Sequence, residues 1–133
     1  MVMLDTNILV YAIRHPDSEV KQHFREYMGG ELCISSISYM ELVDGIKRSR
    51  DVRRNEEALR TILAGIYILP FDTYAAEVAG EISAFLSLSG NRIGEKDTMI
   101  AGHAKSLGLL LITNNTREFK RVPGLQIDDW LDR

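Results

Sequence analysis

Three acidic residues stand at junctions between predicted strands and helices, where side chains can do chemistry. Asp5 closes the apolar run of residues 1–4, Glu41 follows the second predicted strand, and Asp97 begins a helix after a turn-rich loop. An apolar run this short, closed by polar residues, is typical of a buried strand that leads into a helix. In open α/β sheets ligands bind in the crevice outside the carboxyl ends of the strands, so Asp5 is expected to face a cleft.

Helical spacing turns the other two acids toward packed surfaces. Glu41 lies four residues after Ile37, and Asp97 lies three and four residues before Ile100 and Ala101, so each shares a helix face with apolar residues. Ordinary alternatives remain open for each acid alone. Asp97 is also explained as a first-turn acid that the helix dipole favours by about 0.3–1 kcal/mol, and Glu41 as an ordinary glutamate at the edge of a helix face.

Convergence of the three acids would require a cation, because carboxylates gathered in one cleft repel one another and raise one another's pKa. Oxygen ligands without thiolates or paired imidazoles suit Mg²⁺, with Mn²⁺ as the second choice. Such an ion activates water and neutralises charge on a phosphoryl group, and a second ion can lie roughly 3.5–4 Å away. The three acids therefore predict metal-assisted chemistry on a phosphate.

The elements that must position these acids alternate between apolar strand-like runs and amphipathic helical stretches, which predicts an α/β fold with a layered sheet covered by helices. Strands are predicted near residues 1–4, 32–34, 67–69, 109–112 and 125–127. Helices are predicted over 7–14, 19–28, from about 36, 52–64, 73–88 and 97–107, with a short one through 118–119. Glycines 29 and 30 should end the second helix, and the turn-rich loop 89–94 is expected to form a flexible lip on the site.

Composition favours one ordinary globular domain of 133 residues, with 45% hydrophobic and 26% charged residues. The net charge of −3 argues against a broad nucleic-acid-binding surface but allows a local basic rim, because five basic residues lie between Lys47 and Arg54. The alternative for that run is ordinary surface charge. Cys33, the only cysteine, is expected to be a buried thiol. Neither a signal peptide nor a membrane span is recognisable, so a cytoplasmic protein is expected.

The chain resembles the PIN-domain ribonucleases and, among them, the VapC toxins of prokaryotic toxin–antitoxin modules. The similarity covers essentially the whole length, and four motifs in the family's order carry it. These are LDTN at 4–7, ISSI at 34–37 leading to MEL at 40–42, GEKDTMIAGHA at 94–104, and LITNNTREF at 111–119 with the tail PGLQIDDW at 123–130.

The resemblance implies a single PIN domain over residues 1–133, with three α/β/α layers around a central, mainly parallel five-stranded sheet. It also implies a Mg²⁺-dependent endoribonuclease in which Asp5, Glu41 and Asp97 match the family's acidic metal-site positions. Asp5 and Asp97 would hold the ion, with Glu41 as a further ligand candidate that orients or deprotonates a water. In the family, hydrolysis leaves a 5′-phosphate and a 3′-hydroxyl.

The fourth acidic position differs from the family pattern. Where many relatives have an aspartate, this chain has Asn115, with Asn114 beside it and Glu118 one helical turn further on. Whether Glu118 replaces the missing carboxylate, and whether one or two metals bind, is left open. Asn7 and Thr113 resemble supporting hydrogen-bond groups, although helix capping is an alternative for Asn7.

The resemblance further implies an RNA substrate, with the anticodon loop of initiator tRNA as the first candidate, a VapB-type antitoxin partner and a homodimer. Two other functions remain open: a catalytically weak PIN-like binding module, and an aspartate-based phosphotransferase. The phosphotransferase is disfavoured because Asn7 stands where a second acid would be needed. His103, six residues past Asp97, is expected to be structural rather than an acid–base catalyst.

Overall fold

The computed structural model describes residues 1–27 and 31–131, and in that part of the chain five strands and seven helices follow one another. The strands are β1 Val2–Leu4, β2 Leu32–Ser35, β3 Tyr67–Leu69, β4 Leu110–Ile112 and β5 Ile127–Asp128. The helices are α1 Thr6–Arg14, α2 Glu19–Glu26, α3 Ser36–Lys47, α4 Val52–Leu63, α5 Thr73–Leu88, α6 Glu95–Ser106 and α7 Thr116–Phe119.

The five strands form one sheet in the order β3-β2-β1-β4-β5, and every neighbouring pair is parallel. The predicted mainly parallel sheet is thus confirmed. The chain builds outward from β1 through β2 to β3 and then returns to place β4 on the other side of β1. This reversal makes the β1–β4 boundary a topological switch point, where α/β sheets bind ligands. The backbone N–H of Asp5 donates to the carbonyl of Ile112 across that boundary at 2.8 Å.

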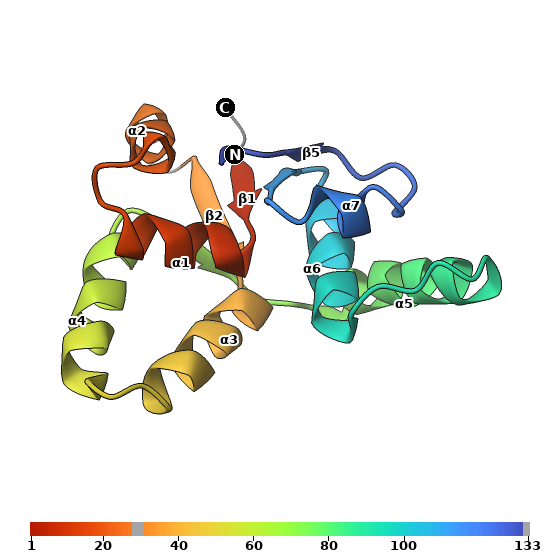
Figure 1. The fold of residues 1–133 in the computed structure, drawn as a ribbon. Coiled ribbons are helices and arrows are strands. Elements are labelled where there is room, and N and C mark those ends of the chain that lie inside the picture. The colour runs from red at the N-terminus through yellow and green to blue at the C-terminus, as the bar shows by residue number, and fades with distance from the viewer. Residues whose placement is uncertain (28–30, 132–133) are drawn as a thin grey trace.

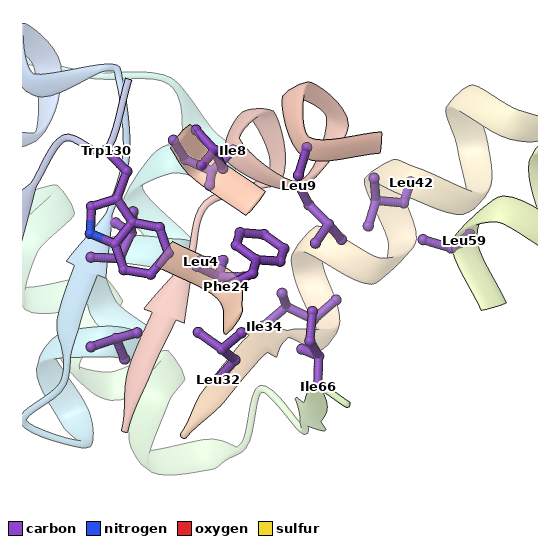
Figure 2. Packing of buried hydrophobic residues seen from close by; sticks show 14 residues of the cluster. Leu4, Ile8, Leu9, Phe24, Leu32, Ile34, Leu42, Leu59, Ile66 and Trp130 are labelled. Atoms are coloured by element: carbon purple, nitrogen blue, oxygen red, sulfur yellow. The ribbon is translucent and has the colours of Figure 1, made fainter. Parts of the chain in front are cut away.

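Alternation along the strands divides the core into two apolar layers. Leu4 and Ile34 point to one face of the sheet, which α1, α2, α3 and α4 cover, whereas Met3 and Leu111 point to the other, which α5, α6 and α7 cover. Figure 1 shows these two groups of helices on opposite sides of the strands. Trp130, near the C-terminus, is buried in the first of these layers (Figure 2). This arrangement confirms the three-layer α/β/α expectation.

Most predicted elements agree with the structure, and the differences lie at element ends. The fifth strand is Ile127–Asp128 rather than 125–127, and α6 begins at Glu95 because the carbonyl of Gly94 already accepts from Thr98 N–H at 2.9 Å. The helix predicted over 19–28 ends at Glu26. Residue 28 and the glycines 29 and 30 lie outside the described residues.

Helices α5 and α6 pack unusually closely on the second face of the sheet. A Cβ atom placed on Gly102 would lie 2.6 Å from the backbone and side chain of Ala79. Only a glycine permits this approach, which sets the close separation of α5 and α6. Cys33 is buried, as expected, and burial raises the pKa of its thiol to about 11. Within residues 1–27 and 31–131, no helix is both long and apolar enough to cross a membrane.

Candidate active site

Asp5 lies buried at the switch point between β1 and β4, with only 3% of its surface exposed. Its Oδ1 accepts from the backbone N–H of Thr6 at 2.8 Å, and its Oδ2 accepts from the Thr113 hydroxyl at 2.9 Å. Burial nevertheless raises the pKa of Asp5 to about 6, with smaller contributions from the charges of Asp97 and Glu41. The two hydrogen bonds therefore offset only part of the cost of burying this carboxylate.

Glu41 reaches the same region from α3 and is half-buried. Its Oε1 accepts from the Thr6 hydroxyl at 2.8 Å. Thr6 thus contacts two of the three acids at once, through its backbone at Asp5 and through its side chain at Glu41. Thr6 was not predicted as a site residue; the signal for it in the sequence is its place inside the LDTN motif, directly after the first acid.

Asp97 lies in the first turn of α6 and is half-buried. Burial raises the pKa of its carboxyl, and the negative charges of Glu41 and Glu118 add to the effect. The side-chain amide of Asn115 donates to Asp97 Oδ2 at 3.3 Å. The charges of Glu41 and Asp97 raise the pKa of Asp5, and the charge of Glu41 raises the pKa of Asp97, so the carboxylates that follow β1 and lie on α3 and α6 influence one another.

At the family's fourth acidic position this chain has the amide of Asn115, with the carboxylate of Glu118 nearby. Besides contacting Asp97, Asn115 donates its backbone N–H to the Thr113 hydroxyl at 2.9 Å, so Thr113 links the end of β4 to Asp5. Glu118 lies close enough to raise the pKa of Asp97 and is 3.6 Å from an Arg121 nitrogen. Asn115 and Glu118 therefore both border the site, and Glu118 stays a candidate ligand.

The two remaining supporting candidates are peripheral. Asn7 and Asn114 are exposed. The capping alternative for Asn7 is wrong, because Asp5 is the N-cap of α1 and accepts from the first helical N–H. Two members of the basic run pair with neighbouring acids at the surface, Lys47 with Glu56 and Arg48 with Asp44, which fits ordinary surface charge at those two positions.

The donor set fits a hard divalent ion, since it consists of carboxylate, hydroxyl and amide oxygens around a buried acid whose charge is uncompensated. In the part of the chain that the structure describes, no three acidic, histidine or cysteine side chains are placed to ligate one ion together. An ion held here would therefore have to use one or two carboxylates and keep several waters, as Mg²⁺ does.

Comparison with known proteins gives consistent matches. The PIN domain model matches residues 2–125. The chain is 43% identical over 128 residues to the tRNA(fMet)-specific endonuclease VapC of Shigella flexneri, covering 96% of each chain. It is 40% identical over 129 residues to ribonuclease VapC2 of Haemophilus influenzae, covering 97% of each.

Solved structures agree with these relatives. The DNA-bound VapBC crystal structure from Salmonella typhimurium aligns with a TM-score of 0.93 and 40% identity, over 98% of this chain and 99% of that one. VapBC2 from Rickettsia felis, bound to a DNA fragment from its promoter, aligns with a TM-score of 0.91 and 33% identity over the same shares. The chain therefore belongs to the PIN domain family and, within it, to the VapC group.

Proposed function

We propose that this protein is the toxin of a VapBC-type toxin–antitoxin system and acts as a Mg²⁺-dependent endoribonuclease. The observation that carries the proposal is the buried Asp5 carboxylate at the sheet's switch point, with Glu41 and Asp97 beside it, in a chain whose relatives are named ribonucleases. A buried, uncompensated carboxylate next to two others destabilises the fold, because like charges repel. The arrangement is therefore better explained by function than by stability.

Each residue has a definite task in the proposed reaction. Asp5 and Asp97 would hold the ion, and Thr113 and Asn115 orient their Oδ2 atoms through the hydrogen bonds at 2.9 and 3.3 Å. When bound, the ion would supply charge neutralisation at the phosphodiester and lower the pKa of water. Glu41, oriented through Oε1 by the Thr6 hydroxyl, aligns the attacking water and accepts its proton.

The substrate and partners follow from the relatives. Because the Shigella protein is named for tRNA(fMet), we propose initiator tRNA as the first substrate, cut in the anticodon loop to leave a 5′-phosphate. Because the Salmonella and Rickettsia structures are VapBC complexes, we propose a VapB-type antitoxin as the inhibitor of this chain. A homodimer and a cytoplasmic location complete the proposal.

The test is cleavage of 5′-labelled initiator tRNA by purified protein in Mg²⁺, with and without EDTA. Wild type should cut only in Mg²⁺ or Mn²⁺, and Asp5→Asn and Asp97→Asn should not cut. Asp44→Asn is the matched control, since this acid lies on the exposed face of α3 and pairs with Arg48. Equal activity of Asp5→Asn, or of wild type in EDTA, would overturn the proposal, because the cleavage would then depend on neither this acid nor a divalent ion.

The same assay separates the alternatives. A binding module would shift the tRNA in a gel without cutting it in either metal. A phosphotransferase would hydrolyse a generic phosphomonoester and leave RNA intact. The structure gives the second alternative no support, because the exposed Asn7 offers no carboxylate beside Asp5.

A further inference from the structure

A buried hydrogen bond links the two helices that carry Glu41 and Asp97. His103, in the last turns of α6, is 2% exposed, and its Nδ1 lies 2.8 Å from the hydroxyl oxygen of Ser35, which is fully buried. Ser35 ends β2 and is the N-cap of α3. None of the chemistry proposed above uses this pair, yet it is a polar contact within an apolar layer.

The direction of the bond follows from what surrounds it. The Ser35 oxygen already accepts from the backbone N–H of Ile37 at 3.0 Å, so its own proton is free to be donated. We assign Nδ1 of the neutral His103 ring as the acceptor of that proton, with the ring proton on Nε2. Burial lowers the pKa of His103, which favours this neutral imidazole. Phe71 packs edge-on against the ring, with centroids 5.6 Å apart, and holds its orientation.

The beginning of α3 is held at a second point next to the first. The Ser36 hydroxyl accepts from the backbone N–H of Phe71 at 3.0 Å. Further along α3, Glu41 accepts from Thr6. The start of the helix is therefore tied to α6 and to the segment before α5, and its acid is tied to the start of α1.

The hydrogen bonds at the start of α3 oppose the electrostatic repulsion between Glu41 and Asp97. Glu41 on α3 and Asp97 on α6 are both acids that border the site, and like charges on two helices favour a wider separation of those helices. A short hydrogen bond in a low-dielectric layer, between groups whose loss would leave a buried polar atom unpaired, opposes that wider separation.

We propose that Ser35 and His103 are positioning residues that set the separation of Glu41 and Asp97 and so preorganise the metal site. The inference rests on the proposed function, since it assigns the pair a task at that site. His103 neither touches the substrate nor transfers a proton. Supporting hydrogen-bond partners of metal ligands typically change metal affinity 10–100-fold. Because His103 acts through two helices, we expect a loss of about five- to tenfold.

The experiment measures Mn²⁺ affinity directly, by the electron paramagnetic resonance signal of free Mn²⁺ in a titration without RNA. His103→Leu removes the acceptor and should weaken Mn²⁺ binding about five- to tenfold. His103→Asn keeps an acceptor oxygen close to the Nδ1 position and should bind within about twofold of wild type. The control for general destabilisation is Ile82→Val, a buried position on α5, a helix that carries none of the three site acids. Unfolding free energies of all variants are measured in parallel.

The outcomes separate the two proposals. If His103→Leu binds Mn²⁺ as wild type does, or if His103→Asn is as weak as His103→Leu, the positioning role is wrong while the metal site stands. If wild type itself binds no Mn²⁺, the metal site and the positioning role fail together. Should His103→Leu not fold, Ser35→Ala removes the donor without adding bulk, and unchanged Mn²⁺ affinity in that variant overturns the role equally.

Discussion

Substituting Asp5 by asparagine should stabilise the metal-free protein while abolishing RNA cleavage. Burial raises the pKa of Asp5 from 3.8 to about 6, so the folded state binds a proton more tightly than the unfolded state does. The stability from that proton is fully present below pH 3.8 and is lost as the pH rises through 6. At about 1.4 kcal/mol per pKa unit, the ionised carboxylate costs the fold about 3 kcal/mol above pH 6.

Asparagine removes the cost of ionisation, because it is uncharged and nearly isosteric and its oxygen still accepts from the Thr6 N–H. At the Oδ2 position its amide must instead donate to the Thr113 hydroxyl, which reverses the bond that Thr113 makes to Asp5. Chemical denaturation in EDTA should show Asp5→Asn more stable than wild type by about 3 kcal/mol at pH 7.5, and by under about 1 kcal/mol at pH 4. In a thermal scan at pH 7.5 the difference corresponds to roughly 10 °C. Added Mg²⁺ should narrow it, since the ion stabilises wild type by mass action and the variant less.

Asp44→Asn is the matched control, because the pKa of Asp44 is lowered whereas that of Asp5 is raised. Arg48 holds the pKa of this exposed carboxyl below its usual range, so removing its charge should bring no gain at pH 7.5. The reasoning about Asp5 is refuted if Asp5→Asn is no more stable than wild type at pH 7.5 in EDTA. It is refuted equally if the gain is the same at pH 4, because a gain independent of pH cannot come from ionisation.

Three further substitutions test other parts of the molecule. Glu41→Gln should lower the cleavage rate about 10²–10⁴-fold and leave the melting temperature within a few degrees of wild type, because only the proton acceptor is lost; a single-turnover assay measures this. Asn115→Asp replaces an amide donor by a fourth charge, so it should lower stability in EDTA and steepen the rise of melting temperature with Mg²⁺; a flat Mg²⁺ response would contradict it. Gly102→Ala should cost about 1–3 kcal/mol in urea denaturation, because its Cβ would meet Ala79 at 2.6 Å, whereas Gly80→Ala on α5, with nothing within 4 Å, should be neutral or stabilising.

The strands were predictable from the sequence, and the three acids could be proposed as site residues, because both depend on local pattern. The alternation that places Leu4 and Met3 in opposite layers, and the acid directly after β1, are visible in a window of a few residues. Contacts between distant segments were not predictable in that way. The bond from Thr6 to Glu41 spans 35 positions and the bond from His103 to Ser35 spans 68, so only the folded chain reveals that these side chains meet.

The contacts of Asn115 explain what an amide can do in place of an aspartate at this position. An aspartate at this position would add a further negative charge beside Asp97, whose pKa is already raised by burial and by Glu41 and Glu118. The amide instead donates to Asp97 Oδ2, and the backbone of the same residue donates to Thr113, which in turn donates to Asp5. One residue therefore orients both proposed ligand carboxylates without adding repulsion. We therefore propose that the site would hold one ion rather than two, because an amide at the fourth position orients the neighbouring carboxylate but adds none of the negative charge that a second ion would need.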